Sequence, residues 1–148
     1  MAEKTIVGVK MKSLPGVKLP SRATSGSAGY DLCAACEMII PAGKHAMVPT
    51  GLSISMPQGL EAQVRPRSGL AAKHAVTVLN SPGTIDSDYR GEVCVILINH
   101  GNEDFKIEPG MRIAQMVFSK VVEVSLEIRS ELDDSDRGEG GFGSTGNS

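Results

Sequence analysis

Apolar and polar residues alternate with a period of two in several short segments, and this pattern constrains the fold of the chain most strongly. The alternation covers residues 7–12, 52–56 and 122–128, and it is typical of strands that bury one face. Two further segments, VCVILI at 93–98 and IAQMVF at 113–118, are almost continuously apolar. Such runs predict strands that are covered on both faces.

Turn-forming sequences separate these segments. They are LPG (14–16), PAG (41–43), PQG (57–59), SPG (81–83), HGNED (100–104) and EPG (108–110). Many short strands joined by turns predict an all-β fold such as a sandwich, a jelly roll or a barrel. We expect one short helix at residues 68–75, with Ser68 as its N-cap.

The 148 residues are enough for one β domain, which we expect over residues 1–130. A cluster of acidic residues then leads into a glycine-rich segment. Glycine loses more backbone entropy on folding than other residues, so we expect residues 131–148 to form a flexible tail.

Composition and charge narrow the class of protein. The net charge of −2 gives no reason to expect binding to nucleic acid or to an anionic membrane. No apolar run approaches the roughly 20 residues of a membrane-spanning helix, and the N-terminus lacks the apolar core of a signal peptide. The chain has three cysteines, which fits a reducing compartment. We therefore expect a cytoplasmic protein.

Cys33 and Cys36 form a C-x-x-C pair. A zinc site would need a second pair of ligands, and the sequence offers none at a suitable spacing. In an extended strand the two thiols would also point to opposite faces. We interpret both cysteines as small apolar residues that fill space in the fold.

The glycines at 138, 140 and 143 have the spacing of a dinucleotide-binding fingerprint. That fingerprint requires a strand before it and a helix after it, and the sequence predicts neither here. We therefore do not expect a Rossmann unit.

The same tail nevertheless carries groups that suit a phosphorylated nucleotide. Glycine N–H groups can approach an anion, and Ser144 and Thr145 add hydroxyl donors. Arg137 can pair with phosphate oxygens, and Phe142 can stack on a base. The tail could therefore act as a lid, and a disordered terminus is the alternative.

Two other segments could contribute to the same chemistry. Arg67 precedes the expected helix start, where it and Ser68 could form an anion site or an ordinary cap. In the segment 79–93 we expect a hairpin with a long turn. Its Asp86 and Asp88 are candidates for a general base, although paired aspartates also serve turns, and Tyr89 could pack against a sugar.

Two further polar residues are candidates for the functional site. Asp31 could hold a hydrated metal, orient an arginine or end a strand. Gln115 lies inside an apolar strand, where it could satisfy backbone groups or reach a ligand.

Five segments of the chain resemble, in order, the five motifs of the trimeric dUTPases (dUTP diphosphatases). They are SAGYDL (27–32), RPRSGLA (65–71), NSPGTIDSDYRGE (80–92), PGMRIAQMVF (109–118) and RGEGGFGSTG (137–146). The resemblance extends from about residue 5 to the end of the chain. Thr84 stands where we would expect an aliphatic residue, and its β-branched side chain suits the same strand position.

The resemblance implies a distorted jelly roll, assembled as a homotrimer whose sites are built from several subunits. The reaction would be the hydrolysis of dUTP to dUMP and pyrophosphate. It would limit uracil incorporation into DNA and supply dUMP for dTMP synthesis. Mg²⁺ is the implied cofactor, carried mainly by the triphosphate, with Asp31 at most reaching its waters.

The resemblance also implies a role for each matching residue. Asp86 would activate the water that attacks the α-phosphorus, and Tyr89 would exclude a 2′-hydroxyl group. The substrate-binding residues would be Arg67, Ser68, Gly69, Asn80, Gly83, Tyr89, Gln115, Arg137, Phe142, Gly143, Ser144 and Thr145. Of these, Arg137 and the residues from Phe142 to Thr145 would close over the substrate.

Three alternatives stand beside this hypothesis. A dCTP deaminase-like enzyme of the same fold would need different groups in the hairpin pocket. A non-catalytic nucleotide sensor could lose the water-activating acid, yet Asp86 is present. A purely structural jelly roll would have no use for Arg137 and Phe142.

Overall fold

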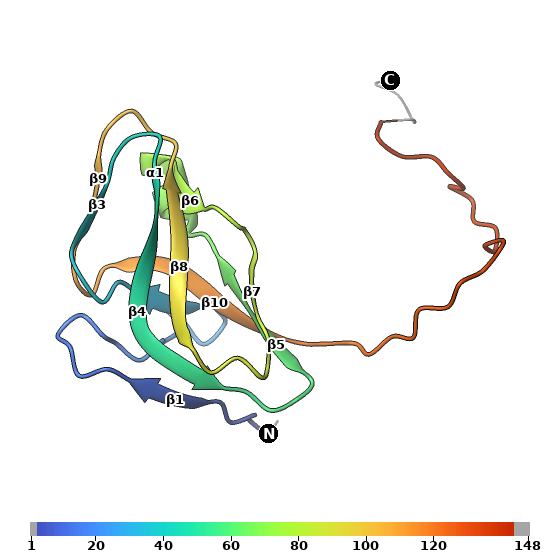
Figure 1. Ribbon diagram of the computed structural model, residues 1–148, viewed down its shortest axis with the longest axis horizontal. Helices are drawn as coiled ribbons and strands as arrows, with labels where there is room; N and C mark the ends of the chain where they lie inside the picture. The colour runs from blue at the N-terminus through green and yellow to red at the C-terminus, as the bar shows by residue number, and fades with distance from the viewer. Residues whose placement is uncertain (1–2, 144–148) are drawn as a thin grey trace.

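The computed structural model describes residues 3–143, which form ten strands and one short helix (Figure 1). The strands are β1 (Gly8–Met11), β2 (Tyr30–Cys33), β3 (Met38–Ile40), β4 (His45–Ser55), β5 (Leu60–Arg65), β6 (Val76–Val78), β7 (Gly83–Ile85), β8 (Glu92–Asn99), β9 (Phe105–Ile107) and β10 (Arg112–Lys120). The helix α1 spans Ser68–His74. The fold is therefore all-β with one short helix, as the alternation and the turn signals predict.

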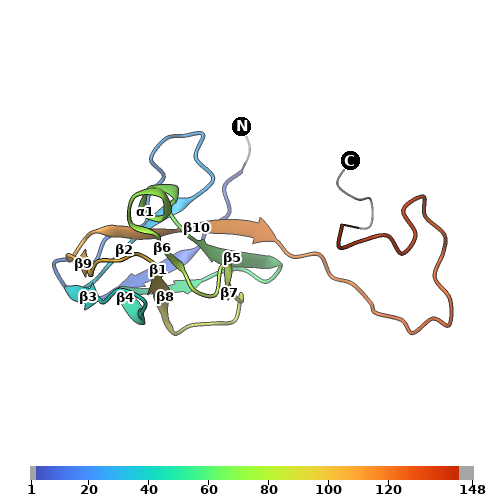
Figure 2. The ribbon, with the colours of Figure 1, turned by 90° about the horizontal axis from the view of Figure 1, so that it is seen from above.

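Two four-stranded sheets and one strand pair make up the body of the protein. Their strand orders are β1-β4-β8-β6, β2-β10-β5-β7 and β3-β9, and every pairing is antiparallel. Figure 2 shows the first two sheets as layers, with β10, β2 and β5 above β4 and β8. This layered arrangement matches the predicted jelly roll.

One hydrophobic core joins all three sheets. Val48 and Val95 come from the first sheet, Leu32 and Met116 from the second, and Ile107 from the strand pair. These side chains are almost completely buried. Removing apolar surface from water is the main force that holds such layers together.

The hairpin expected over residues 79–93 forms, and its two strands extend beyond that segment on both sides. Strand β6 pairs with β8, and Leu79 extends this ladder by donating to the carbonyl of Ile96. The connection between the arms includes β7, which pairs with β5 of the second sheet. The connection thus crosses from one sheet to the other, and it carries Asp86 and Tyr89.

Some predictions about burial are wrong for the single chain. Strand β1 forms, but all four of its residues are exposed. In β8, Val93, Val95 and Leu97 are buried, whereas the residues between them are only half-buried. β8 is therefore covered fully on one face and not on both.

The alternating segment 122–128 does not form a strand. Strand β10 ends at Lys120, and the described chain beyond it leads away from the sheets (Figures 1 and 2). A strand needs a neighbour to accept its backbone hydrogen bonds, and the described part of the chain provides none here. The side chains of Val122, Val124, Leu126 and Ile128 are consequently exposed.

The helix α1 forms close to the expected place but begins differently. Arg67 occupies the N-cap position and makes no side-chain cap hydrogen bond, so Ser68 is the first helical residue and not the cap. Leu70 anchors the helix in the core. Within residues 3–143, no helix is long and apolar enough to span a membrane.

Candidate functional site

A cavity of about 470 Å³ lies where β2, β10 and the start of α1 meet. Lys18, Arg67 and Arg112 bring three positive charges to its wall, and Asp31 brings one negative charge. We call this group of four side chains the cationic cluster. Its excess of positive charge suits a ligand with several negative charges, such as a phosphate chain.

Backbone pairing and hydrogen bonds hold the cationic cluster in place. The Arg67 guanidinium donates to the backbone carbonyl oxygen of Arg112 at 3.3 Å. The Arg112 guanidinium lies 3.8 Å from the carboxylate of Asp31. Lys18 donates to the carbonyl oxygen of Gly110 at 3.2 Å. Asp31 thus faces an arginine. Orienting an arginine was one of the three alternatives that the sequence left open for Asp31.

Gln115 belongs to the same region. It is the cross-strand partner of Asp31 in the β2–β10 pair, and its side-chain amide donates to the carbonyl oxygen of Pro66 at 3.2 Å. The sequence-predicted residues Asp31, Arg67 and Gln115 are therefore brought together. Ser68 and Gly69 follow Arg67 at the exposed start of α1.

Cys33 also lines this cavity. Burial raises the pKa of the Cys33 thiol, although the charges of Lys18 and Arg112 oppose the shift. A raised pKa keeps the thiol protonated, and the protonated form is neither a good nucleophile nor a metal ligand. This agrees with an apolar role for Cys33.

A second, smaller pocket of about 250 Å³ lies beside the connection between β6 and β8. Asp86 and Tyr89 line this pocket together with the less polar side chains of Met47, Cys94 and Ile96. We call residues 86–91 the Asp86 loop. The carboxylate of Asp86 is exposed, so water can reach it as a general base requires.

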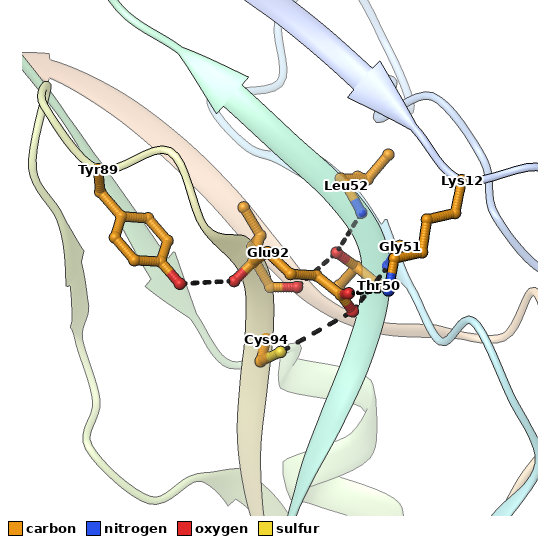
Figure 3. Close-up of polar contacts among 8 residues, drawn as sticks. Lys12, Thr50, Gly51, Leu52, Tyr89, Glu92 and Cys94 are labelled. Carbon is orange, nitrogen blue, oxygen red and sulfur yellow. Dashed lines mark hydrogen bonds and ion pairs between the residues drawn. The ribbon is translucent and has the colours of Figure 1, made fainter.

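Hydrogen bonds shape the Asp86 loop. The Tyr89 N–H donates to the carbonyl oxygen of Asp86 at 3.1 Å, and the Arg90 guanidinium donates to the carbonyl oxygen of Ser87 at 2.6 Å. The Tyr89 hydroxyl donates to the carbonyl oxygen of Glu92 at 2.9 Å (Figure 3). The phenol ring is thereby tied to the first residue of β8.

Asn80 and Gly83 lie at the other end of the same connection. Gly83 is buried in β7, and the Asn80 side-chain amide lies close to it, 3.6 Å from where a β-carbon on Gly83 would be. Asn80 itself is exposed, so its amide is accessible to a ligand.

The described part of the tail leads away from the sheets (Figures 1 and 2). Arg137 donates to the carbonyl oxygen of Gly140 within the tail, and the Phe142 side chain is fully exposed. Gly143 is the last described residue. The predicted site residues Ser144 and Thr145 lie outside the described residues.

One chain does not bring all the predicted residues together. The cavity with Asp31 and Arg67 shares no lining residue with the pocket that contains Asp86 and Tyr89. Arg112, which contacts both Asp31 and Arg67, was not predicted from the sequence. Its only signal was its place in the PGMRIAQMVF segment, since a single exposed arginine carries no pattern of its own.

The two antiparallel sheets, the cationic cluster and the separate loop with Asp86 and Tyr89 define an all-β protein suited to bind a phosphorylated ligand. Comparison with known proteins identifies the family within this class. The family model described as dUTPase matches residues 16–146. The chain therefore belongs to the dUTPase family.

Individual relatives agree with this membership. The chain is 58% identical over 146 residues to a deoxyuridine 5′-triphosphate nucleotidohydrolase of Rickettsia bellii, covering 96% of this chain and 97% of that protein. It is 56% identical over 142 residues to the protein of the same name from Clostridium acetobutylicum, covering 95% and 98% of the two chains.

A solved structure shows the same fold. It is the dUTPase of Staphylococcus bacteriophage 80alpha with dUpNHpp, with a TM-score of 0.88 and 26% sequence identity. The similarity covers 97% of this chain and all of the phage chain.

Proposed function

We propose that this protein hydrolyses dUTP to dUMP and pyrophosphate. The observation that carries the proposal is the cationic cavity lined by Asp31 and Arg67, with Gln115 paired to Asp31 across the strands. A separate pocket contains Asp86 and Tyr89. Family membership supplies the substrate, because the relatives carry the name of this activity.

The triphosphate would bind at the cationic cluster. Arg67 can hold phosphate oxygens as a planar fork, and the backbone N–H groups of Ser68 and Gly69 are free at the start of the helix. The Gln115 amide can add a further hydrogen bond. These contacts would fix the α-phosphorus for attack in line with its leaving group.

The Asp86 loop would supply the base and the specificity. Asp86 takes a proton from a water molecule, and the resulting hydroxide attacks the α-phosphorus, releasing pyrophosphate. The ring of Tyr89 packs against the deoxyribose and leaves no room for a 2′-hydroxyl group. Asn80 and the backbone near Gly83 bind uracil by hydrogen bonds.

Mg²⁺ is part of the proposal, and the described residues fit an ion that the substrate carries. No group of three or more acidic, histidine or cysteine side chains that could hold a metal occurs among residues 3–143. Asp31 is a single carboxylate that already faces Arg112, so it would reach the ion through water. Mg²⁺ prefers phosphate oxygens and waters, and it would neutralise charge on the triphosphate.

We also propose that the protein is a homotrimer whose copies complete each other's sites. Two observations support an assembly: the residues of the site lie in separate pockets of one chain, and the apolar side chains of residues 122–132 are exposed. A single chain leaves such a segment in water at a considerable cost in free energy. A second copy would cover it.

The tail would act as a lid over the bound nucleotide. Arg137 would reach the phosphates, Phe142 would stack on uracil, and Gly143, Ser144 and Thr145 would add hydrogen-bond donors. A cytoplasmic location belongs to the same proposal, and the three free cysteines are consistent with it.

The test is the release of pyrophosphate from dUTP, dCTP, dTTP and UTP, each with and without Mg²⁺. We expect fast, Mg²⁺-dependent release from dUTP alone. Ammonia released from dCTP, without turnover of dUTP, would instead indicate a deaminase. Binding of dUTP without turnover would indicate a nucleotide sensor.

Two matched variants test which aspartate is the general base. Asp86→Asn should bind dUTP but lose turnover by about 10²- to 10⁴-fold, the usual contribution of a general base. Asp88→Asn, an isosteric change two residues away in the same loop, should keep most of the activity. Near wild-type turnover by Asp86→Asn would show that the assigned base is wrong.

A further inference from the structure

Glu92 contacts three separate parts of the chain from the first position of β8 (Figure 3). Its carboxylate lies 2.6 Å from the Lys12 ammonium group and accepts a hydrogen bond from the Gly51 N–H at 3.3 Å. Its backbone carbonyl oxygen accepts the hydrogen bond from the Tyr89 hydroxyl. One residue thus joins the segment directly after β1, the strand β4 and the Asp86 loop.

The carboxylate of Glu92 lies where the sheet is irregular. The register between β4 and β8 shifts between Pro49 and Leu52. The Thr50 hydroxyl bridges this irregularity by donating to the carbonyl oxygen of Val93 and accepting from the N–H of Leu52. Side chains therefore replace ladder hydrogen bonds at the point where β8 begins.

The pair of Glu92 and Lys12 is charged near neutral pH. The hydrogen bond from Lys12 lowers the pKa of the Glu92 carboxyl group, although partial burial opposes the shift. The same bond raises the pKa of Lys12. The neighbouring Cys94 thiol lies 4.0 Å from the carboxylate, and burial raises its pKa, so no thiolate competes for the lysine.

Tyr89 depends on Glu92 for its attachment to the sheet. The Tyr89 N–H bonds to the carbonyl oxygen of Asp86, and the Arg90 guanidinium bonds to the carbonyl oxygens of Ser87 and Tyr89. These hydrogen bonds all stay within the Asp86 loop. The bond from the Tyr89 hydroxyl to Glu92 is the one that joins the ring to β8. Any shift of the Glu92 backbone would therefore move the phenol ring.

We propose that Glu92 and Lys12 are positioning residues that set the orientation of the Tyr89 ring and, through it, the discrimination between dUTP and UTP. This inference rests on the proposed function, which places the Tyr89 ring against the deoxyribose. It assigns a role at the active site to Lys12, a residue directly after the exposed strand β1 and outside all five motifs.

The test compares kcat/KM for dUTP with kcat/KM for UTP in Lys12→Met and Glu92→Gln variants. The Lys12 side chain is 62% exposed, and ion pairs with an exposed partner are weak. We therefore expect the dUTP-to-UTP ratio to fall by about five-fold in each variant, and not by orders of magnitude. The double variant should be no worse than the single variants, since both remove the same contact. Lys12→Arg should restore the ratio.

Two lysine variants serve as matched controls. Lys10→Met removes the same charge from β1, where its cross-strand partner is Ser53. Lys106→Met removes exposed ion pairs with Glu37 and Glu108 elsewhere in the fold. Both controls should keep the wild-type ratio.

A spectroscopic measurement tests the inference without relying on turnover. The chain contains two tyrosines, so ¹³C-labelled tyrosine rings give two sets of NMR signals, and Tyr89→Phe assigns them. Lys12→Met should shift the Tyr89 signal and leave the Tyr30 signal in place. An unmoved Tyr89 signal with an unchanged ratio would overturn the inference, even if the variant lost stability.

The same measurements separate this inference from the proposed function. If the wild-type protein failed to hydrolyse dUTP, the proposed function would be wrong. The Tyr89 signal would still show whether Lys12 and Glu92 control the ring.

Discussion

Gly29 and Gln115 approach so closely that a β-carbon on Gly29 would lie 2.1 Å from Oε1 of Gln115 and 2.9 Å from its Cδ. Gly29 belongs to the SAGYDL segment and Gln115 to β10. The absence of a side chain at position 29 therefore allows the Gln115 amide to lie beside Pro66 and the cationic cluster.

We predict that Gly29→Ala displaces the Gln115 side chain and raises KM for dUTP by about ten-fold or more, the effect of losing a hydrogen bond to a charged group. Steady-state kinetics and thermal unfolding would be measured together. Gly26→Ala is the matched control, since a β-carbon there meets its nearest atom only at 3.9 Å. If both variants bound dUTP equally well, Gln115 would have no part in binding.

Gly91 likewise leaves space for the Tyr89 side chain, because it has no side chain of its own. A β-carbon on Gly91 would lie 2.4 Å from the Tyr89 hydroxyl oxygen and 2.6 Å from the ring carbon that bears it. We predict that Gly91→Ala moves the ring and lowers the dUTP-to-UTP ratio of kcat/KM by about ten-fold. An unchanged ratio in a folded variant would show that Tyr89 does not read the sugar.

Deletion of residues 137–148 tests the lid. The body of the protein has its own core without these residues, so we predict a folded assembly with little activity. Circular dichroism, sedimentation and pyrophosphate release would be measured on the same sample. Phe142→Ala should lose about ten-fold in kcat/KM, in line with the loss of one base-stacking contact. An unfolded or monomeric deletion product would mean that the tail is structural.

The pair of Glu92 and Lys12 predicts a pH dependence of stability. The pKa of Glu92 is lower in the folded protein than its ordinary value of 4.5. Its contribution is therefore complete above about pH 4.5 and is lost as the pH falls through the folded value. The pKa of Lys12 is raised above 10.5, so its contribution is complete below that pH and is lost at higher pH.

Urea unfolding of the wild-type protein and Lys12→Met, from pH 7 down to pH 3, measures this dependence. The difference in unfolding free energy between the two proteins should be constant from pH 7 to about pH 5 and should shrink at lower pH. Lys10→Met should differ from the wild-type protein by an amount that does not change with pH. A Lys12→Met difference that stayed constant to pH 3 would show that the pair does not stabilise the fold.

The alternation of apolar residues predicted strands best where the chain covers its own surface. The segment 52–56 is an example, because Leu52, Ile54 and Met56 are all buried in the core. The same pattern at 122–128 gives an exposed segment that pairs with no strand among residues 3–143. Alternation indicates that one face of a strand will be buried. It does not indicate whether the same chain or another chain buries that face.

The sequence motifs named individual candidate residues for the site but not their arrangement. The motifs identified Asp31, Arg67 and Gln115, and the structure brings them together because β2 pairs with β10 and α1 begins beside them. Asp86 is separated from this group because it directly follows β7, which lies at the opposite edge of the second sheet from β2. Long-range pairings of this kind leave no local signal, which also explains why Arg112 and Lys12 were missed.

The central claim is that separate chains contribute the Asp86 loop and the cationic cluster to one site. Mixed assemblies of two inactive variants, Asp86→Asn and Arg67→Gln, test it most directly. The variants would be co-expressed with different tags and purified through both. If the two groups come from different chains, each mixed trimer should regain one intact site, so the doubly purified sample should recover about one third of the wild-type dUTP hydrolysis. Mixed assemblies that remained as inactive as either variant alone would contradict a site shared between chains.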